Sequence, residues 1–363
     1  MQADIMAGKG PDLIYISENY FARSDVDKMI HSGVFSDMTP FIKADKEFDF
    51  SNYNASAMKF GVVDGKRYIM PTSYNIPMLL TTQSLLDKVR FDPKKCTDFW
   101  SFNDELNKYS SIYTENMPNI FTSGIYNIAN FNNLAGMKIL NYEDKKVLIN
   151  TPEFKRAAQT IHNLCIKNDW YYESYVNGMD TKYLYDQIAF LANYDYGSFG
   201  ALFNDILALY AKGEKPIFFP IRDLNGKIQG KYSFGAAITN NSSNKQNAYN
   251  FVKLLLSEQG QMQFNSSPLR SIPVLNSAVD KAYEYFQQPI TMTFGDSTFP
   301  LPPLAKEDFD LYKSYLKDVD KVTAHGSVQQ QLDMLMLPYY LGKKSYEECI
   351  KEAQDALEIY MSE

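Results

Sequence analysis

The sequence predicts an α/β protein of two domains, with mainly parallel sheets flanked by helices. Three observations lead to this prediction. The chain has 363 residues, more than a single hydrophobic core usually serves. Short apolar strand patterns alternate along it with helical patterns. Hydrophobic residues make up 45% of the chain, yet no run approaches the roughly 18 apolar residues that a membrane helix needs.

Three short apolar runs are predicted as strands. The run 13–16 follows a Gly-Pro-Asp turn and is apolar on both faces, which indicates a buried parallel strand. The run 188–192 has the same character. The run 234–238 contains small residues, which would let another backbone come close.

A hairpin and an extended segment are predicted between the first two runs. Asp64 and Gly65 stand between β-prone pairs, which is typical of a two-residue hairpin turn. The segment 70–80 follows, and Pro71 and Pro77 exclude a helix from it. We therefore expect an extended chain there.

Helix starts are marked by capping patterns. Thr151 followed by Pro152 predicts a helix that continues with apolar residues at helical spacing. Ser345 and Glu348 form a capping-box pair at the start of the last helix, and Ser243 with Gln246 forms the same pattern at the start of an earlier one.

Charge and cysteine content exclude several classes of function. The net charge is −7, and the acidic residues are scattered without a basic cluster, so we expect no nucleic-acid partner. The three cysteines, Cys96, Cys165 and Cys349, contain no CxxC pair. They predict neither a disulfide framework nor a thiolate metal site. For Cys165 and Cys349, packing in the core is the better interpretation.

Signatures of catalysis and cofactor binding are missing from the sequence. The three histidines stand apart, Gly8 to Gly10 precedes its strand and lacks a third glycine, and the segment 197–200 is one residue short of a nucleophile elbow. We therefore predict no catalytic residue, no metal and no cofactor. A glycoside hydrolase or another carbohydrate-active enzyme stays open as an alternative, because it needs only two carboxylates across a cleft.

Six segments, in the same order along the chain, resemble the family 1 extracellular solute-binding proteins, the group that includes the maltose-binding protein. The segments are MAGKGPDLI at 6–14, SGVFSDMTPFI at 32–42, DGKRYIMP at 64–71, NAYNFVKLLLSEQGQ at 247–261, IPV at 272–274 and YLGKKSYEECIKEAQ at 340–354. The resemblance spans nearly the whole chain.

This resemblance implies a two-lobed fold of the type II periplasmic-binding-protein class, with a hinge of crossing strands. The expected first lobe is 1–76, the second lobe 77–233, the return to the first lobe 234–300, and the hinge crossing with C-terminal helices packed on the second lobe 301–363. The implied function is the receptor of an ABC importer, a monomer that captures a mono- or oligosaccharide between its lobes by hinge closure and hands it to the transmembrane permease subunits.

The same resemblance implies where the solute is bound. Relatives place ligand contacts after the first strand, at the inter-lobe crossing and after the 188–192 strand, where an aromatic ring stacks on the sugar. The implied ligand-binding residues are Ser17, Glu18, Asn19, Tyr20, Tyr74, Asn75, Tyr126, Tyr194, Asp195, Tyr196 and Gln329. The aromatic content of 15%, with 27 tyrosines, suits a sugar, although related folds carry polyamines, thiamine, iron or phosphorylated compounds.

The front of the chain departs from the family pattern. Members open with a signal peptide, often a lipid-attachment cysteine, and then a strand, a helix and a strand; this chain begins at the helix before the AGKGPD turn. We therefore expect an N-terminally truncated version of an extracytoplasmic lipoprotein, with no signal peptide in the chain as written.

Overall fold

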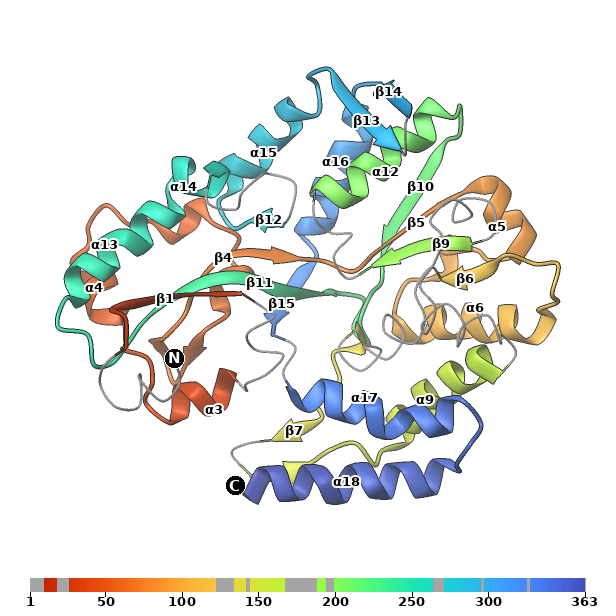
Figure 1. Ribbon diagram of the computed structural model, residues 1–363, viewed down its shortest axis with the longest axis horizontal. Helices are drawn as coiled ribbons and strands as arrows, with labels where there is room; N and C mark the ends of the chain where they lie inside the picture. The colour runs from red at the N-terminus through yellow and green to blue at the C-terminus, as the bar shows by residue number, and fades with distance from the viewer. Residues whose placement is uncertain are drawn as a thin grey trace. The chain divides into compact units, whose positions relative to one another are not determined.

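The computed structural model of the chain forms two compact units (Figure 1). It describes residues 10–17, 26–121, 134–141, 144–166, 188–193, 199–263, 271–294, 297–324 and 327–362. Unit 1 consists of Met1–Ile76, Asp195–Lys212 and Gly230–Ser327, and unit 2 of Pro77–Tyr194, Gly213–Gln229 and Val328–Glu363. Neither unit is a continuous stretch of sequence.

The composition of unit 1 differs from the expected first lobe in three segments. Residues 195–212 and 230–233 were expected in the second lobe and residues 301–327 in the hinge segment, but all three fall in unit 1. Aromatic packing explains the difference, because the Phe203 ring lies 5.3 Å from the Phe286 ring and 5.0 Å from the Tyr312 ring. Both partner residues belong to unit 1. Packing within the core of unit 1 therefore attaches the helix that carries Phe203 to that unit.

The main sheet of unit 1 contains three described antiparallel strand pairs. Its order is β1-β11-β4-β12, and β15 pairs with β11 off this path; β1, β4 and β12 align antiparallel with their neighbours. The strands are β1 (Leu13–Ser17), β4 (Met70–Asn75), β11 (Ile228–Ile238), β12 (Ile272–Pro273) and β15 (Val319–Thr323).

The expectation of mainly parallel pairing therefore does not hold for these three pairs. The run 13–16 is not buried on both faces: Ile14 and Ile16 are buried, whereas Tyr15 between them is 39% exposed. Such alternation suits antiparallel pairing. In unit 2, β6 pairs parallel with β9, whereas β5 pairs antiparallel with both β10 and β9.

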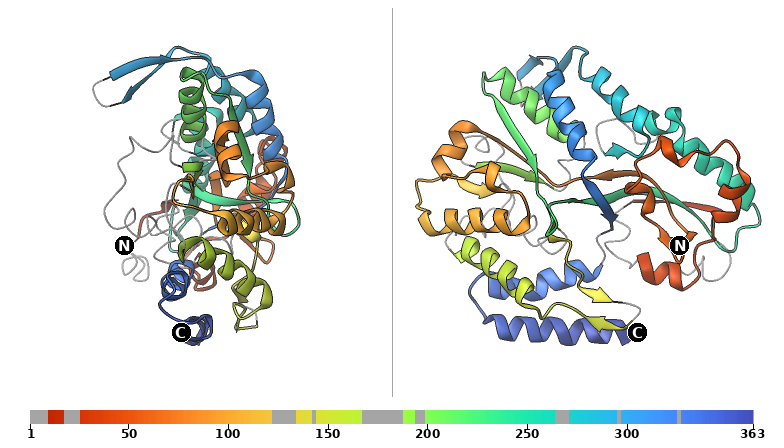
Figure 2. Two further views of the ribbon diagram at one scale, coloured as in Figure 1. Left: turned by 90° about the vertical axis from the view of Figure 1, so that its right-hand side faces the viewer. Right: turned by 180° about the vertical axis from the view of Figure 1, so that it is seen from behind.

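Helices and hairpins complete unit 1. The hairpin β13–β14 projects from the rest of this unit (Figure 2, left). The helices are α3 (Val26–His31), α4 (Thr39–Ala44), α12 (Phe199–Ala211), α13 (Lys245–Leu256), α14 (Glu258–Gln263), α15 (Asn276–Tyr285) and α16 (Lys306–Leu316). The hairpins are β2 (Val62–Val63) with β3 (Lys66–Arg67) and β13 (Ile290–Phe294) with β14 (Ser297–Leu301), and the 3₁₀ turns are η1 (Phe50–Asn52) and η2 (Ala57–Lys59).

Two local predictions in unit 1 have different outcomes. The hairpin at Asp64 and Gly65 is confirmed, since both have positive φ angles of 49° and 73°, as a type I′ turn requires. The capping role of Ser243 is wrong: α13 begins at Lys245 with Asn244 as its N-cap. The Asn244 side chain instead donates to the carboxylate of Asp12, 3.1 Å away.

Close backbone approach in unit 1 is confirmed at β11. A Cβ atom added to Gly235 would lie 2.6 Å from the Met70 carbonyl oxygen, and one added to Gly230 would lie 2.9 Å from Cγ2 of Val322 on β15. Glycine is therefore required where β11 meets its neighbours.

Unit 2 is built on a sheet of order β10-β5-β9-β6 with helices around it. Helices α17 and α18 lie side by side (Figures 1 and 2). The strands are β5 (Met78–Thr82), β6 (Asn119–Phe121), β9 (Ile188–Asn193) and β10 (Pro216–Pro220), with the small hairpin β7 (Leu140–Asn141) and β8 (Lys146–Val147). The helices are α5 (Gln83–Val89), α6 (Phe99–Ile112), α9 (Pro152–Ile166), α17 (Ser327–Tyr340) and α18 (Tyr346–Ser362), with the 3₁₀ turn η3 (Pro93–Lys95).

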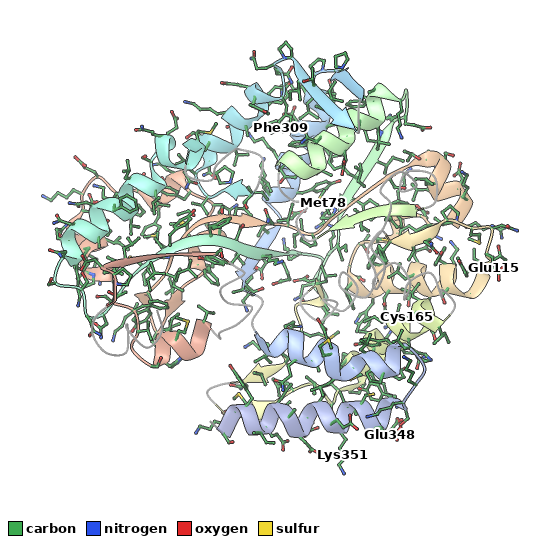
Figure 3. The ribbon with its side chains drawn as sticks, in the orientation of Figure 1. Met78, Glu115, Cys165, Phe309, Glu348 and Lys351 are labelled. Atoms are coloured by element: carbon green, nitrogen blue, oxygen red, sulfur yellow. The ribbon has the colours of Figure 1, made fainter. Side chains whose placement is uncertain are left out.

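The predicted helix starts of unit 2 are confirmed. The Phe154 amide donates to Oγ1 of Thr151 over 3.2 Å. At α18, the Ser345 amide donates to the Glu348 carboxylate over 2.9 Å and the Glu348 amide donates to Oγ of Ser345 over 3.2 Å, a complete capping box. Glu348 and Lys351 lie on the exposed side of this helix (Figure 3).

The buried side of the same helices forms the core of unit 2. Cys165 on α9 and Cys349 on α18 lie within it, which confirms the prediction of core packing for these two thiols. No helix in the described ranges combines the length and the apolar character that crossing a membrane requires.

Candidate functional site

One face of the unit 1 sheet carries polar and aromatic residues from several strands. Phe234 on β11 is aligned with Ser17 of β1 on one side and with Ser73 of β4 on the other, and Ser73 is aligned with Pro273 of β12. Residues aligned across strands share a face, and so do residues two apart along a strand. Tyr15 and Asn75 therefore lie on the same face as Ser17 and Ser73.

Two bulges interrupt the register between β4 and β11. The alignment steps from Tyr232 with Tyr74 to Phe234 with Ser73, and then from Phe234 with Ser73 to Gly235 with Pro71. Ser233 is thus the extra residue of β11 and Thr72 the extra residue of β4. Bulges redirect side chains and are frequent next to binding and active sites.

Hydroxyl groups cluster around the bulges. The Tyr15 hydroxyl and Oγ1 of Thr72 are 3.0 Å apart, and Oγ of Ser233 lies 2.6 Å from Oγ of Ser271. Burial raises the pKa of the Tyr15 hydroxyl, so this group stays a neutral hydrogen-bonding partner.

Two polar atoms on this face lack a hydrogen-bond partner within the described part of the chain. They are Oγ of Ser73 and Oδ1 of Asn75, on residues that are 0% and 3% exposed. Leaving a buried polar atom unpaired costs about 1–3 kcal/mol. An unpaired hydroxyl beside an unpaired amide oxygen can bind a ligand that offers hydroxyl groups.

Tyr74 lies on the opposite face of the sheet from Ser73 and Asn75. It is aligned with Tyr232 and Ile272 and is buried. Burial raises the pKa of its hydroxyl above the ordinary value. Its ring packs in the core of unit 1, and its assignment as a ligand contact stays a prediction.

Unit 2 contributes a separate polar pair on α17. Gln329 is buried, and its Nε2 atom has no partner among the described residues. Asp333 follows one helical turn later and therefore lies on the same side of the helix. Desolvation raises the pKa of the Asp333 carboxyl well above its ordinary value, which favours the protonated form as a hydrogen-bond donor.

The remaining predicted site residues lie outside the described residues. They are Glu18, Asn19, Tyr20, Tyr126, Tyr194, Asp195 and Tyr196. Three of them directly follow β9, whose last residue, Asn193, is aligned with Met78 at the start of β5. Among the described residues, the structure brings Ser17 and Asn75 onto one face of unit 1 and places Gln329 in unit 2.

Sequence reasoning missed Tyr15, Thr72, Ser73, Ser233 and Ser271. A signal was present, because Thr72 and Ser73 are polar residues in the middle of a buried extended segment. Buried polar residues are unusual enough to require an explanation. No group of three or more His, Cys, Asp or Glu in the described ranges is arranged to hold a metal ion.

Comparison with known families places this geometry in context. Residues 1–292 match the family described as bacterial extracellular solute-binding protein. No curated protein matches the sequence.

Solved structures with the same fold are available. The sugar-binding protein MalE from Xanthomonas citri is 13% identical, with a TM-score of 0.68, over 99% of this chain and 86% of that one. An ABC substrate-binding protein from Listeria monocytogenes in complex with cycloalternan is 17% identical, with a TM-score of 0.65, over 99% and 87%.

A third similar structure is the ABC transporter solute-binding protein from Thermotoga lettingae bound with α-D-tagatose. It is 16% identical, with a TM-score of 0.63, over 99% of this chain and 88% of that one. The chain therefore has the two-lobed fold of periplasmic solute-binding proteins.

Proposed function

The chain belongs to the family of bacterial extracellular solute-binding proteins, and from this membership we propose that it is the extracytoplasmic receptor of an ABC importer, with a neutral mono- or oligosaccharide as its solute. The observation that carries the carbohydrate assignment is the polar face of the unit 1 sheet. Ser73 and Asn75 offer unpaired oxygen atoms there beside two aromatic rings. Sugars combine hydroxyl groups with apolar C–H faces, so this set of groups suits them.

In this proposal both units contribute polar groups to one solute molecule. Ser17 and Asn75 act from unit 1 and Gln329 from unit 2, with Glu18, Asn19, Tyr20 and Tyr126 as further ligand residues. Closure about the crossing strands follows from differential binding, because a solute shifts the equilibrium toward the state in which it has contacts with both units. The closed monomer is then the form that the permease subunits recognise.

The residues that follow β9 supply the aromatic contact in this proposal. Tyr194 and Tyr196 stack on the sugar, and Asp195 accepts from its hydroxyls. Replacing both tyrosines with alanine should weaken binding at least tenfold, which corresponds to about 1.4 kcal/mol. Titration calorimetry measures the change, and Tyr285→Ala on α15 is the control. Equal affinity of the double variant and this control would contradict the role of Tyr194 and Tyr196.

A thermal-shift panel tests the function as a whole. The full chain is heated with maltose, maltotriose, D-tagatose and cycloalternan, and in parallel with putrescine and thiamine. A saccharide that binds the folded protein at 100 times its Kd adds about 2.7 kcal/mol of stability and raises Tm. A shift with the cationic solutes alone would reject the carbohydrate assignment.

The same saccharides separate a receptor from an enzyme. We expect one molecule bound per chain by calorimetry and unchanged oligosaccharide by chromatography after long incubation. Accumulation of shorter products would instead favour the glycoside hydrolase alternative, which needs a carboxylate pair across the bound bond.

A further inference from the structure

Helices α6 and α9 of unit 2 pack against each other (Figure 1), and polar side chains line their contact. Nδ2 of Asn107 on α6 donates to Oγ1 of Thr160 on α9 over 2.7 Å, and Nδ2 of Asn163 on α9 donates to Oδ1 of Asn107 over 3.2 Å. Further along α6, Oγ of Ser110 donates to the main-chain oxygen of Asn163 over 2.9 Å. Direct hydrogen bonds therefore join the two helices.

The hydrogen bonds continue from α9 to a third helix, α17. Nε2 of Gln159 donates to Oδ1 of Asn163 over 3.0 Å, and the Tyr339 hydroxyl donates to Oε1 of Gln159 over 2.8 Å. Nδ1 of His162 lies 2.7 Å from the main-chain oxygen of Tyr339. These polar groups have direct partners, so an unpaired buried group beside them requires an explanation.

Asn103 on α6 is such a group. It precedes Asn107 by four residues, so both lie on the same side of the helix, and its main-chain oxygen accepts from Nδ2 of Asn107 over 3.1 Å. Asn103 is 0% exposed, yet neither Oδ1 nor Nδ2 has a hydrogen-bond partner among the described residues. Among the buried amides that the structure describes, it alone has both ends unpaired.

Core packing by itself does not explain an asparagine at this position. A leucine of similar size would fill the same space without burying two unpaired polar atoms. An occupant that pairs these atoms must be small, because protein interiors are close-packed. It must be neutral, because a charge at a fully buried position is costly without a charged partner. It must also both donate and accept hydrogen bonds, since the amide offers both kinds of group.

We propose that unit 2 binds an internal water molecule at Asn103, beside the contact between α6 and α9. Water is small and neutral, can donate to Oδ1 or accept from Nδ2, and at buried sites typically makes about three hydrogen bonds to polar groups without other partners. The water extends the network of Asn107, Thr160 and Asn163 toward the core. This site is independent of the proposed function, because it involves none of the proposed solute-binding residues.

The test detects the water directly in the full chain. The protein is labelled with ¹⁵N in its asparagine side chains, and NMR records NOE and ROE cross peaks between the carboxamide protons and water. The signal that disappears in Asn103→Leu belongs to Asn103. Asn107 is the matched internal control, since it is an asparagine one turn away whose two ends are paired with protein groups.

We expect the Asn103 carboxamide to give water cross peaks of opposite sign in the NOE and ROE spectra. Opposite signs indicate a long-lived bound water, whereas proton exchange with the solvent gives equal signs. Asn107 should give no cross peak of this kind. Relaxation dispersion of ¹⁷O water should count about one long-lived water fewer in Asn103→Leu than in the wild type. Ser111→Ala, at an exposed position of the same helix, should leave the count unchanged.

Three results would overturn the water site. The first is the absence of opposite-sign cross peaks at Asn103. The second is an equal count of long-lived waters in Asn103→Leu and the wild type. The third is the same cross peak at Asn107, because solvent would then enter the whole contact between α6 and α9. If Asn103→Leu does not fold, through-bond experiments assign the Asn103 signal, and the wild-type spectra decide.

Discussion

The sheets of the two units differ in what they bury. In unit 2, β5 is aligned with β10 and β9 without interruption, and its residues Met78, Leu79 and Leu80 are apolar and buried. In unit 1, β4 is equally buried but carries Thr72, Ser73 and Asn75. The buried Thr81 and Thr82 of β5 have hydrogen-bond partners, whereas Ser73 and Asn75 of β4 keep unpaired atoms among the described residues. A sheet with regular register and paired polar groups is a scaffold, whereas a bulged sheet with unpaired buried polar atoms is a place where something remains to be bound.

The largest effect expected from this difference is a loss of stability in unit 2. Phe190 on β9 is fully buried, and its ring has edge contacts with Phe91 at 4.8 Å and Phe219 at 5.9 Å. Phe190→Ala should lower the free energy of unfolding by about 3–5 kcal/mol, because it leaves a cavity between those rings. Denaturant unfolding measures the change.

The control for this substitution is Phe251→Ala on α13, where the side chain is 42% exposed. The free energy of unfolding of that variant should stay within about 0.5 kcal/mol of the wild-type value. A loss below about 1 kcal/mol for Phe190→Ala would show that the unit 2 sheet tolerates disruption and would weaken its description as a scaffold.

The next effect concerns Asp333, the acidic residue that follows Gln329 on α17. Desolvation raises the pKa of its carboxyl in the folded state. Above the ordinary pKa of aspartate the unfolded chain releases this proton while the folded chain keeps it, so stability falls as pH rises, by up to about 1.4 kcal/mol per pH unit. Asp333→Asn should therefore be more stable than the wild type at pH 7, with a flatter profile from pH 4 upward.

Denaturant unfolding at several pH values tests this expectation. Asp355→Asn on the exposed side of α18 is the control and should leave the profile unchanged. If Asp333→Asn has the same slope as the wild type, the Asp333 carboxyl is ionised in the folded protein, and its role as a donor beside Gln329 is excluded.

The smallest expected change in the free energy of unfolding concerns two serines of unit 1, where alanine substitutions should act in opposite directions. Ser73→Ala removes an unpaired buried hydroxyl and should leave stability unchanged or raise it by up to about 1 kcal/mol. Ser233→Ala breaks the 2.6 Å contact with Ser271 and should lower stability by about 1 kcal/mol. Thermal unfolding of the two variants in the absence of sugar compares them.

Measurements of saccharide affinity add to this comparison of Ser73 with Ser233. Ser73→Ala should weaken saccharide affinity up to tenfold even though the folded protein is no less stable, the trade between stability and function that binding sites show. A destabilisation of more than 1 kcal/mol by Ser73→Ala would mean that its hydroxyl is already paired in the free protein.

Local features of the fold were predictable because they depend on neighbouring residues. The cap at Thr151, the capping box at Ser345 and Glu348 and the turn at Asp64 each rest on contacts within a few positions. The apolar runs likewise marked β1 and β9. The two-lobed fold followed from the resemblance, not from these patterns.

The direction in which strands pair and the face of the sheet on which a side chain lies were not predictable from the sequence. Both depend on partner strands that are far away in sequence. Burial of Tyr74 follows from its alignment with Tyr232, 158 positions later, and Tyr15 is placed by strands from three segments. The bulges at Thr72 and Ser233 exist only in the pairing of β4 with β11. For this reason the group of hydroxyl-bearing residues around the bulges was missed, although each of them stands in the printed sequence.

The alternation of the chain between its two units has a consequence for synthesis on the ribosome. Unit 1 requires residues up to Ser327, and unit 2 requires Val328–Glu363, which include α17 and α18. Neither hydrophobic core can form completely before its last segment has been translated. Apolar strands such as β5 and β9 therefore stay exposed to solvent during most of translation. We expect nascent chains to depend on holdase chaperones until release, more than a protein whose domains are completed one after the other.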